Sequence, residues 1–220
     1  MTSSTTAKPI EVQLIADFAC PWCYLGLARF ERARAMRPER AIELVWRPFF
    51  LNPGLPPDGM DRGAYLRAKF GAEAGRVYGR IAESGRADGI RFAFERMRRT
   101  PNTLQAHRLA LHAAEHGRGE AMIEALFRAL FEDGRDIGAD DQLAELGQAV
   151  GLERDATTEF LAGDALAADV VALHQRAEKL GVRGVPVFVV DREQVISGAQ
   201  PPEALVGLFD LTHTSTTATV

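Results

Sequence analysis

Cysteine is nearly absent from this sequence, because Cys20 and Cys23 are the only two among its 220 residues. A small secreted protein held together by disulfides would need more cysteines at wider spacing, so that class is excluded. Two cysteines separated by two residues are instead typical of a redox-active pair or of half a zinc site. The segment Cys20-Pro21-Trp22-Cys23 is therefore the first candidate for chemistry.

The sequence also lacks long apolar runs and an excess of basic residues. No stretch of about 18 apolar residues occurs, so no transmembrane helix is expected. The formal net charge of −4 gives no reason to expect nucleic acid or a membrane as a partner. Residues 1–8 lack the basic and apolar parts of a secretory signal, which favours a cytoplasmic protein.

The first part of the chain predicts a strand, a helix and a second strand. Residues 10–17 are rich in β-branched side chains and end at a polar residue, and residues 41–50 predict another strand. Between them Cys23 and apolar residues recur at helical spacing up to about Met36, and Pro38 ends the helix. The cysteine motif therefore lies where the first strand passes into the helix.

A loop rich in proline and glycine, residues 51–61, separates this part from a long helical region. From about residue 62 to residue 163 the pattern is almost entirely helical. The clearest helices in it are predicted over residues 101–116, 119–132 and 140–150. Asp140 and Gly151 are expected to cap the last of these.

The remaining residues predict a helix, two strands and a short helix. These elements cover residues 165–180, 185–190, Gln194–Ser197 and 201–209. Gly181 is expected to end the first helix, whose apolar face consists of Leu166, Val170, Leu173, Ala177 and Leu180.

Joined across the helical region, these two parts make the thioredoxin arrangement. The predicted fold class is α/β, with a mixed central sheet and an inserted all-α helical domain. The expected boundaries are 9–55 and 164–210 for the thioredoxin-like parts, 56–163 for the insertion, and 1–8 and 211–220 for flexible tails.

Pro186 stands at the head of the strand predicted over residues 185–190. Proline is poorly tolerated inside a central strand, because it has no N–H to donate to the ladder. A cis peptide bond before Pro186 would explain its position, since cis peptides occur almost only before proline.

The motif has the features that disulfide exchange requires. Pro21 suits the first helical position, so Cys20 precedes the helix, where free N–H groups and the helix dipole stabilise a thiolate. The thiolate is the reactive species. Cys23 lies one turn later on the inward face, so we assign Cys20 to attack and Cys23 to resolution, with Pro21 and Trp22 tuning the pair. Asp17, at the end of the first strand, is either a proton acceptor for Cys23 or an ordinary loop cap.

Zinc binding is the structural alternative for such a pair. Without a further cysteine, the other ligands would have to come from His107, His112, His116, His174 and His213. His112 and His116 have the i, i+4 spacing of some zinc sites, but they lie far along the chain in the predicted insertion. The sequence therefore favours redox chemistry without a metal.

The segment from Asp17 to Gly26, with the sequence DFACPWCYLG, resembles the signature of DsbA-family oxidoreductases, specifically the FrnE-like subgroup. Further segments agree in order and spacing: WRPF at 46–49, NT at 102–103, AHRL at 106–109, GVPVF at 184–188 and SGAQ at 197–200. The resemblance extends from residue 11 to about residue 209. It implies a thioredoxin fold with an inserted helical domain, in a largely cytoplasmic subgroup.

The resemblance also implies roles for particular residues. A cis-proline at Pro186 would face the cysteines, and the backbone of Val185 would pair with the bound substrate. Asn102 and His107 would line a substrate pocket, although His107 fits a core position equally well, and Tyr24 would rim the cleft or pack against the insertion. Some members carry a second cysteine pair that this chain lacks, so the resemblance does not extend to isomerisation that depends on it.

The sequence therefore predicts a thiol–disulfide oxidoreductase that exchanges Cys20 and Cys23 with protein thiols and disulfides or with glutathione. The alternative is a glutathione-dependent isomerase or transferase, similar to 2-hydroxychromene-2-carboxylate isomerases and kappa-class glutathione transferases. Those enzymes typically place a serine where Cys20 stands. A third alternative is a binding module with a vestigial motif. No cofactor is expected apart from glutathione as a co-substrate, and the sequence does not distinguish a monomer from a dimer.

Overall fold

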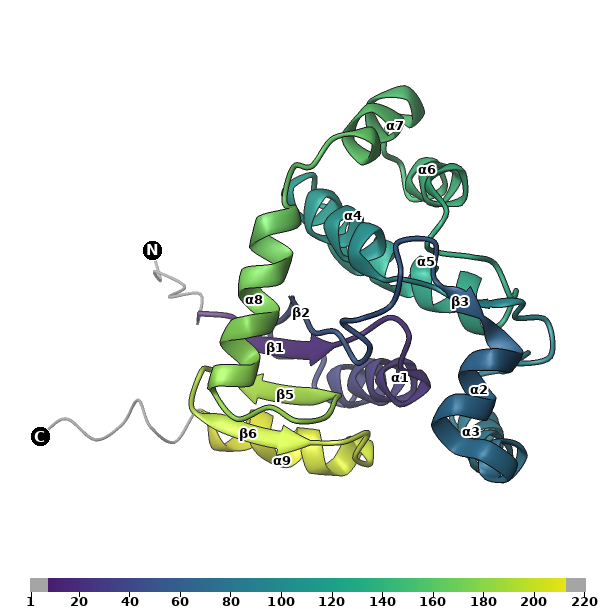
Figure 1. The fold of residues 1–220 in the computed structure, drawn as a ribbon. Helices are drawn as coiled ribbons and strands as arrows, with labels where there is room; N and C mark the ends of the chain where they lie inside the picture. The colour runs from purple at the N-terminus through teal and green to yellow at the C-terminus, as the bar shows by residue number, and fades with distance from the viewer. Residues whose placement is uncertain (1–7, 213–220) are drawn as a thin grey trace, which may run out of the picture.

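A computed structural model of the chain describes residues 8–212 (Figure 1). The elements follow in the order β1 (Ile10–Ala16), α1 (Pro21–Ala35), β2 (Ile42–Pro48), β3 (Met60–Asp61), α2 (Arg62–Phe70), η1 (Gly71–Glu73), α3 (Ala74–Ala87), β4 (Arg99–Thr100), α4 (Leu104–Glu115), α5 (Gly119–Phe131), α6 (Asp140–Ala149), α7 (Arg154–Ala162), α8 (Ala167–Lys179), β5 (Val187–Val190), β6 (Gln194–Ser197) and α9 (Pro202–Leu211). None of the helices in residues 8–212 is long and apolar enough to span a membrane. The predicted flexible tails, 1–8 and 211–220, lie outside the described residues except for Lys8, Leu211 and Thr212.

A mixed sheet with the strand order β2-β1-β5-β6 forms the centre of the molecule. β1 and β2 run parallel, and α1 makes the crossover that a parallel pair requires. β5 is antiparallel to β1, and β6 is antiparallel to β5. These strands and the helices around them confirm the predicted thioredoxin fold with a helical insertion.

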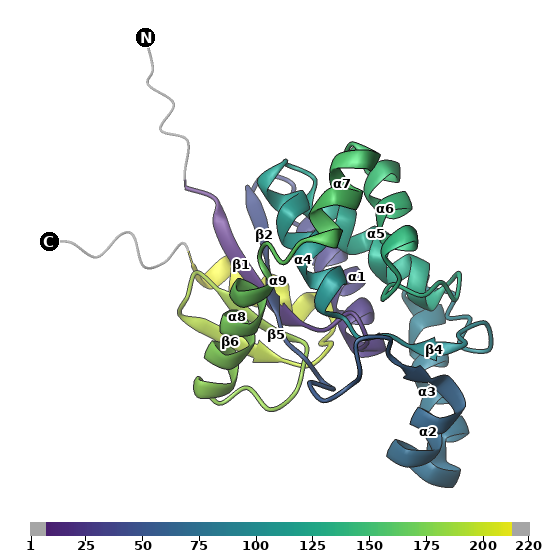
Figure 2. The same cartoon turned by 45° about the horizontal axis from the view of Figure 1, so that its top comes forward.

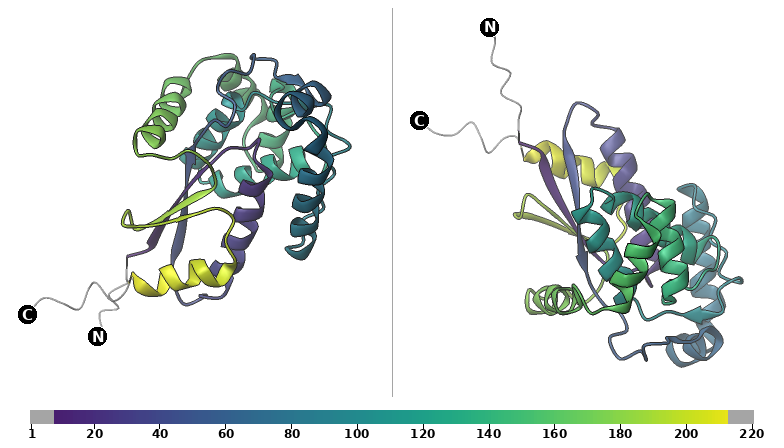
Figure 3. Two further views of the ribbon diagram at one scale, coloured as in Figure 1. Left: turned by 60° about the horizontal axis from the view of Figure 1, so that its bottom comes forward. Right: turned by 90° about the horizontal axis from the view of Figure 1, so that it is seen from above.

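Helices cover both faces of this sheet. α1 and α9 lie on one face and α8 lies on the other (Figures 1 and 3). Because side chains alternate along a strand, Val12 and Leu14 of β1 share a buried cluster with Phe30 of α1. Ile15 points the other way and clusters with Ala177 of α8. The cysteine-bearing helix and α8 are therefore separated by the sheet.

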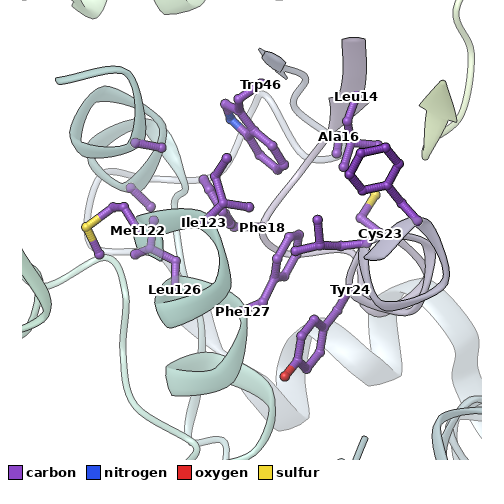
Figure 4. Close-up of a cluster of buried hydrophobic side chains, with 14 of the residues drawn as sticks. Leu14, Ala16, Phe18, Cys23, Tyr24, Trp46, Met122, Ile123, Leu126 and Phe127 are labelled. Carbon is purple, nitrogen blue, oxygen red and sulfur yellow. The ribbon is translucent and has the colours of Figure 1, made fainter. Parts of the chain in front are cut away.

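The helices from α2 to α7 lie between β2 and α8 in the chain, as the sequence predicts. In Figure 4, Phe127 of α5 lies beside Tyr24 of α1 and close to Phe18. One cluster of buried apolar side chains continues from the sheet into α5 and α6. The insertion therefore shares its core with the thioredoxin-like part, and the domain boundaries at 55/56 and 163/164 stay predictions.

The structure departs from the predicted elements in several details. β3, labelled in Figure 1, and β4, labelled in Figure 2, pair antiparallel inside the insertion that was predicted to be all-helical. Strands of two residues leave no alternating pattern in a sequence. Leu180 is 74 % exposed instead of buried, because α8 ends at Lys179. Asp140, which was predicted to cap α6, is the first residue of the helix, and Ala139 occupies the N-cap position.

Candidate active site

Cys20 and Cys23 lie where β1 passes into α1. Cys20 is the N-cap of this helix, with an extended backbone (φ −100°, ψ 109°), and Pro21 stands in the first turn, as the sequence predicts. The Cys23 N–H donates to the Cys20 carbonyl at 3.0 Å, which places Cys23 one turn further on. Both thiols are free. Cys20 keeps 4 % of its surface exposed and Cys23 none, which favours Cys20 as the attacking thiol.

The segment before β5 forms the opposite side of the site. The Val185–Pro186 peptide bond is cis, which confirms the prediction made for it. The Cys20 thiol donates to the Val185 carbonyl, with 3.7 Å between the sulfur and the oxygen. A Cβ at Gly26 of α1 would lie 3.0 Å from Pro186 Cγ, so glycine lets the helix pack closely against the proline. Two segments from opposite ends of the chain thus meet at the thiols.

Cys23 is held in its protonated form by its surroundings. Burial contributes most, and together with the Cys20 side chain it raises the pKa of Cys23 well above the ordinary value. The negative charge of Asp17 acts in the same direction. A thiol must lose its proton to act as a nucleophile, so Cys23 is suited to attack only at close range, on a sulfur already bound to Cys20.

Asp17 is buried at the end of β1 and is surrounded by donors. Its Oδ1 accepts hydrogen bonds from the Ala19 N–H at 3.1 Å and from the Thr103 hydroxyl at 2.9 Å. Its Oδ2 accepts from the Leu51 N–H at 2.7 Å. Burial alone would raise the pKa of this carboxyl, but His107 and the backbone N–H groups outweigh it, so that the pKa is lowered. Asp17 is therefore a buried carboxylate that joins three separate segments.

His107 of α4 lies between Asp17 and Trp46. The Trp46 indole N–H can only donate, and it lies 3.1 Å from His107 Nδ1, so Nδ1 is the acceptor and Nε2 carries the ring hydrogen. Nε2 lies 3.5 Å from Asp17 Oδ1 and has no hydrogen-bond partner among the described residues. Because His107 is completely buried, the prediction that it lines a substrate pocket is wrong. His107 instead helps to lower the pKa of Asp17.

A cavity of about 150 Å³ lies beside Asp17, and Ala19, Asn52 and Asn102 contribute to its lining. The Asn102 side-chain N–H donates to the Leu55 carbonyl at 3.0 Å. Its oxygen accepts from the backbone N–H at the start of α4 at 3.0 Å. Asn102 thus borders the cavity, but both its donor and its acceptor are used within the protein, and its contact with substrate stays a prediction.

Tyr24 and Trp22 flank the second cysteine in the sequence but differ in position. Tyr24 is buried, its ring stacks on Phe127 at 5.3 Å between centroids, and its hydroxyl donates to Glu132. The prediction that Tyr24 rims the cleft is therefore wrong, and its alternative, packing against the insertion, holds. Trp22 is 39 % exposed, next to Pro21 at the start of α1.

Sequence reasoning did not assign Thr103, Trp46 or Gly26 to the site. All three stand in segments that carry the family resemblance, and this resemblance is the only feature of the sequence that could have pointed to them. Nothing in the sequence indicates that the Thr103 hydroxyl reaches Asp17 or that Gly26 faces Pro186. These contacts depend on how distant segments pack.

The histidines considered as zinc ligands have other surroundings. His112 stacks on Phe160 at 4.1 Å and lies 4.4 Å from the His116 ring. His213 lies outside the described residues. In the described part of the chain, no group of three or more histidine, cysteine, aspartate or glutamate side chains is arranged to hold a metal ion.

The thioredoxin fold and its paired thiols define a protein of the thiol–disulfide oxidoreductase type. The chain belongs to the DSBA-like thioredoxin domain family, whose family model matches residues 11–210. It is similar to the crystal structure of a probable DsbA oxidoreductase from Streptomyces coelicolor, with 36 % identity and a TM-score of 0.83 over 96 % of this chain and 92 % of the other. These matches confirm the predicted resemblance to the DsbA family.

Two more distant structures share the fold. One is the cytosolic disulfide reductase DsbM from Pseudomonas aeruginosa, solved with glutathione, with 22 % identity and a TM-score of 0.64 over 93 % of this chain and 99 % of the other. The other is a 2-hydroxychromene-2-carboxylate isomerase, with 16 % identity and a TM-score of 0.68 over 94 % of this chain and 96 % of the other. At these identities the likeness concerns the fold alone.

Proposed function

We propose that this protein exchanges its Cys20–Cys23 pair with the disulfide of a protein or of a small thiol compound. The observation that carries the proposal is the approach of Cys20 Sγ to the Val185 carbonyl, 3.7 Å away beside the cis-proline. An extended substrate segment can pair with the backbone of Val185 and so bring its own sulfur to Cys20. Cys20 stands at the N-cap of α1 and is the more exposed of the two thiols, so an incoming sulfur reaches it first.

The exchange proceeds in two steps, each of which forms one sulfur–sulfur bond and breaks another. The Cys20 thiolate attacks one substrate sulfur, a bond between Cys20 and the substrate forms, and the other substrate sulfur leaves as a thiolate. Cys23 then attacks Cys20 Sγ, the internal disulfide forms, and the second substrate sulfur leaves. Two electrons and two thiol protons pass from the pair to the substrate, which becomes two thiols. Run in reverse, the same steps oxidise a substrate dithiol, and the relative potentials set the direction.

We further propose glutathione as a small co-substrate and the cytoplasm as the location. The support is the DsbM structure, which is described as a cytosolic disulfide reductase and was solved with glutathione. The fold shared with the isomerase keeps a glutathione-dependent isomerase as the second candidate. Against it stands Cys20 itself, because a protein thiol at this position can react directly.

Insulin reduction by dithiothreitol tests the proposal. The wild-type protein is expected to accelerate insulin precipitation, and Cys20→Ser is expected to fall to the uncatalysed rate. Cys23→Ser should retain attack but fail to resolve, so it should accumulate a mixed disulfide with a substrate peptide, visible by mass spectrometry. Equal rates for all three proteins would refute redox catalysis. Isomerisation or glutathione conjugation that survives in Cys23→Ser would favour the second candidate.

A further inference from the structure

The sheet face under α8 is only partly covered. A cavity of about 410 Å³ lies between this face and the C-terminal half of α8. Its apolar lining consists of Ile15, Leu173, Ala177, Leu180 and Val189. Its polar lining consists of Gln13, Arg47, Arg176 and Arg192. Three arginines thus face one cavity that also has apolar walls.

Strand register explains why these side chains meet. Ile15 of β1 pairs with Arg47 of β2, and Gln13 pairs with Val189 of β5, so all four side chains project from the same face of the sheet. The residues of β1 between them, such as Leu14, point to the opposite face, toward α1. The cavity is therefore on the other side of the sheet from the helix that carries Cys23.

Arg47 lacks a carboxylate partner in this part of the molecule. Its Nε donates to the neutral Gln13 side chain at 3.0 Å, and no ion pair with Arg47 is found within residues 8–212. Glu11 is the nearby carboxylate, but its two oxygens are bonded to Arg192, at 3.1 and 3.3 Å. Burial and the charges of Arg176 and Arg192 lower the pKa of Arg47, against the attraction of Glu11. The cavity thus holds positive charge in excess, although the whole chain carries a net charge of −4.

We propose that this cavity binds a small organic anion that has an apolar body and one anionic head, such as a medium-chain or aromatic carboxylate. The apolar lining accommodates the body, and the planar guanidinium of Arg47 offers paired donors to the head. Arg176 and Arg192 add attraction at the rim. The volume lies in the range of sites for small organic ligands and exceeds what a bare inorganic anion fills. This inference is independent of the thiol chemistry.

The test uses the full chain and the fluorescent probe 8-anilinonaphthalene-1-sulfonate, which combines an aromatic body with a sulfonate. We expect one probe molecule to bind per chain and octanoate to displace it. Arg47→Gln should weaken probe binding at least about tenfold, because a charge-assisted contact is lost. Arg80→Gln is the matched control, since it removes the same charge from an exposed position on α3, and it should leave binding unchanged.

A second variant tests the apolar side of the cavity. Leu173 is half-buried, and Leu173→Glu would place a carboxylate among the arginines, so probe binding should be abolished while the urea unfolding midpoint is retained. Equal probe affinity in wild type and in a folded Arg47→Gln protein would overturn the proposal. Displacement by inorganic phosphate as effective as by octanoate would also overturn it, as would displacement by an acidic peptide but not by octanoate.

Discussion

Replacing Asp17 by asparagine tests how the buried carboxylate supports the thiols. The two side chains have nearly the same shape, but asparagine is neutral and has an NH₂ group in place of one oxygen. In the structure both oxygens accept hydrogen bonds, including that from the Leu51 N–H at 2.7 Å. An amide nitrogen at the same place would face this N–H donor to donor. The substitution therefore removes a buried charge and leaves one part-buried N–H without a partner.

The cost can be estimated from these contacts. A buried donor left unsatisfied costs about 1–3 kcal/mol, and hydrogen bonds to a charged group contribute more than those to a neutral one. We therefore expect Asp17→Asn to lower the free energy of unfolding by about 2–3 kcal/mol at pH 7. For a chain of this size that corresponds to a fall of roughly 5–10 °C in melting temperature. Urea unfolding followed by circular dichroism measures the difference.

The difference in unfolding free energy between wild type and Asp17→Asn should become smaller at low pH. The pKa of Asp17 is lowered in the folded protein, so its contribution to stability is complete above the pKa of a free aspartate, about 3.9. It is lost as the pH falls through the lower pKa of the folded state. The stability difference between wild type and Asp17→Asn should thus be constant from pH 5 to pH 8 and should shrink only below pH 4.

The same variant separates two roles for Asp17 in resolution. The charge of Asp17 raises the pKa of Cys23, and a carboxylate of lowered pKa is a weak base, so removing it should leave resolution at pH 7 as fast as before or faster. If Asp17 is instead a proton acceptor for Cys23, which is one of the two roles that the sequence leaves open, resolution should slow by roughly 10²–10⁴-fold.

Reaction with 5,5′-dithiobis(2-nitrobenzoate) resolves the two steps. Attack by Cys20 releases the first thionitrobenzoate and attack by Cys23 releases the second, so stopped-flow absorbance reports each rate. A large slowing of the second release alone would refute our reasoning on the charge of Asp17. An unfolding free energy equal to that of wild type would refute the structural role of its hydrogen bonds.

Three further experiments check the packing at Gly26, the reactivity of the two thiols and the role of Tyr24. Gly26→Ala, whose methyl lies 3.0 Å from the cis-proline ring, should cost about 1–3 kcal/mol and slow insulin reduction, whereas Gly79→Ala in the open part of α3 should stabilise by up to about 1 kcal/mol. Iodoacetamide at pH 7 should modify Cys20 once and leave Cys23 unmodified, as peptide mass spectrometry would show, because Cys23 is buried with a raised pKa. Tyr24→Phe should lose about 0.5–1.5 kcal/mol in urea unfolding and keep its insulin-reduction rate; a large loss of activity would restore Tyr24 to the site.

Elements with a strong local pattern could be predicted from the sequence, and their ends were least certain. β6 has the predicted bounds, and α8 differs from its predicted range by two residues at its start and one at its end. β5 begins at Val187 instead of residue 185, and the Val185 carbonyl ahead of it accepts from the Cys20 thiol. The short strands β3 and β4 had no detectable pattern, because two residues cannot show a period.

In the candidate site, too, features set by local sequence could be predicted, and features set by long-range contacts could not. The positions of Cys20 and Pro21 at a helix start follow from local rules of helix capping, and the sequence indicates them directly. The surroundings of His107 do not follow, because they depend on contacts with Trp46 and Asp17 across long stretches of chain. A histidine in an apolar helix face gives no sign of whether it lines a pocket or packs inside.

The contacts of Asp17 explain why the helical insertion belongs to the site. Thr103 and His107 both come from the start of α4, and both approach Asp17 Oδ1, which lies at the end of β1 just before the cysteines. Trp46 of β2 fixes the ring hydrogen of His107 from the other side. A shift of α4 would therefore change the hydrogen bonding of a buried charge whose field acts on Cys23. Because the insertion also shares the apolar core, its packing and the ionisation of the resolving thiol are physically linked.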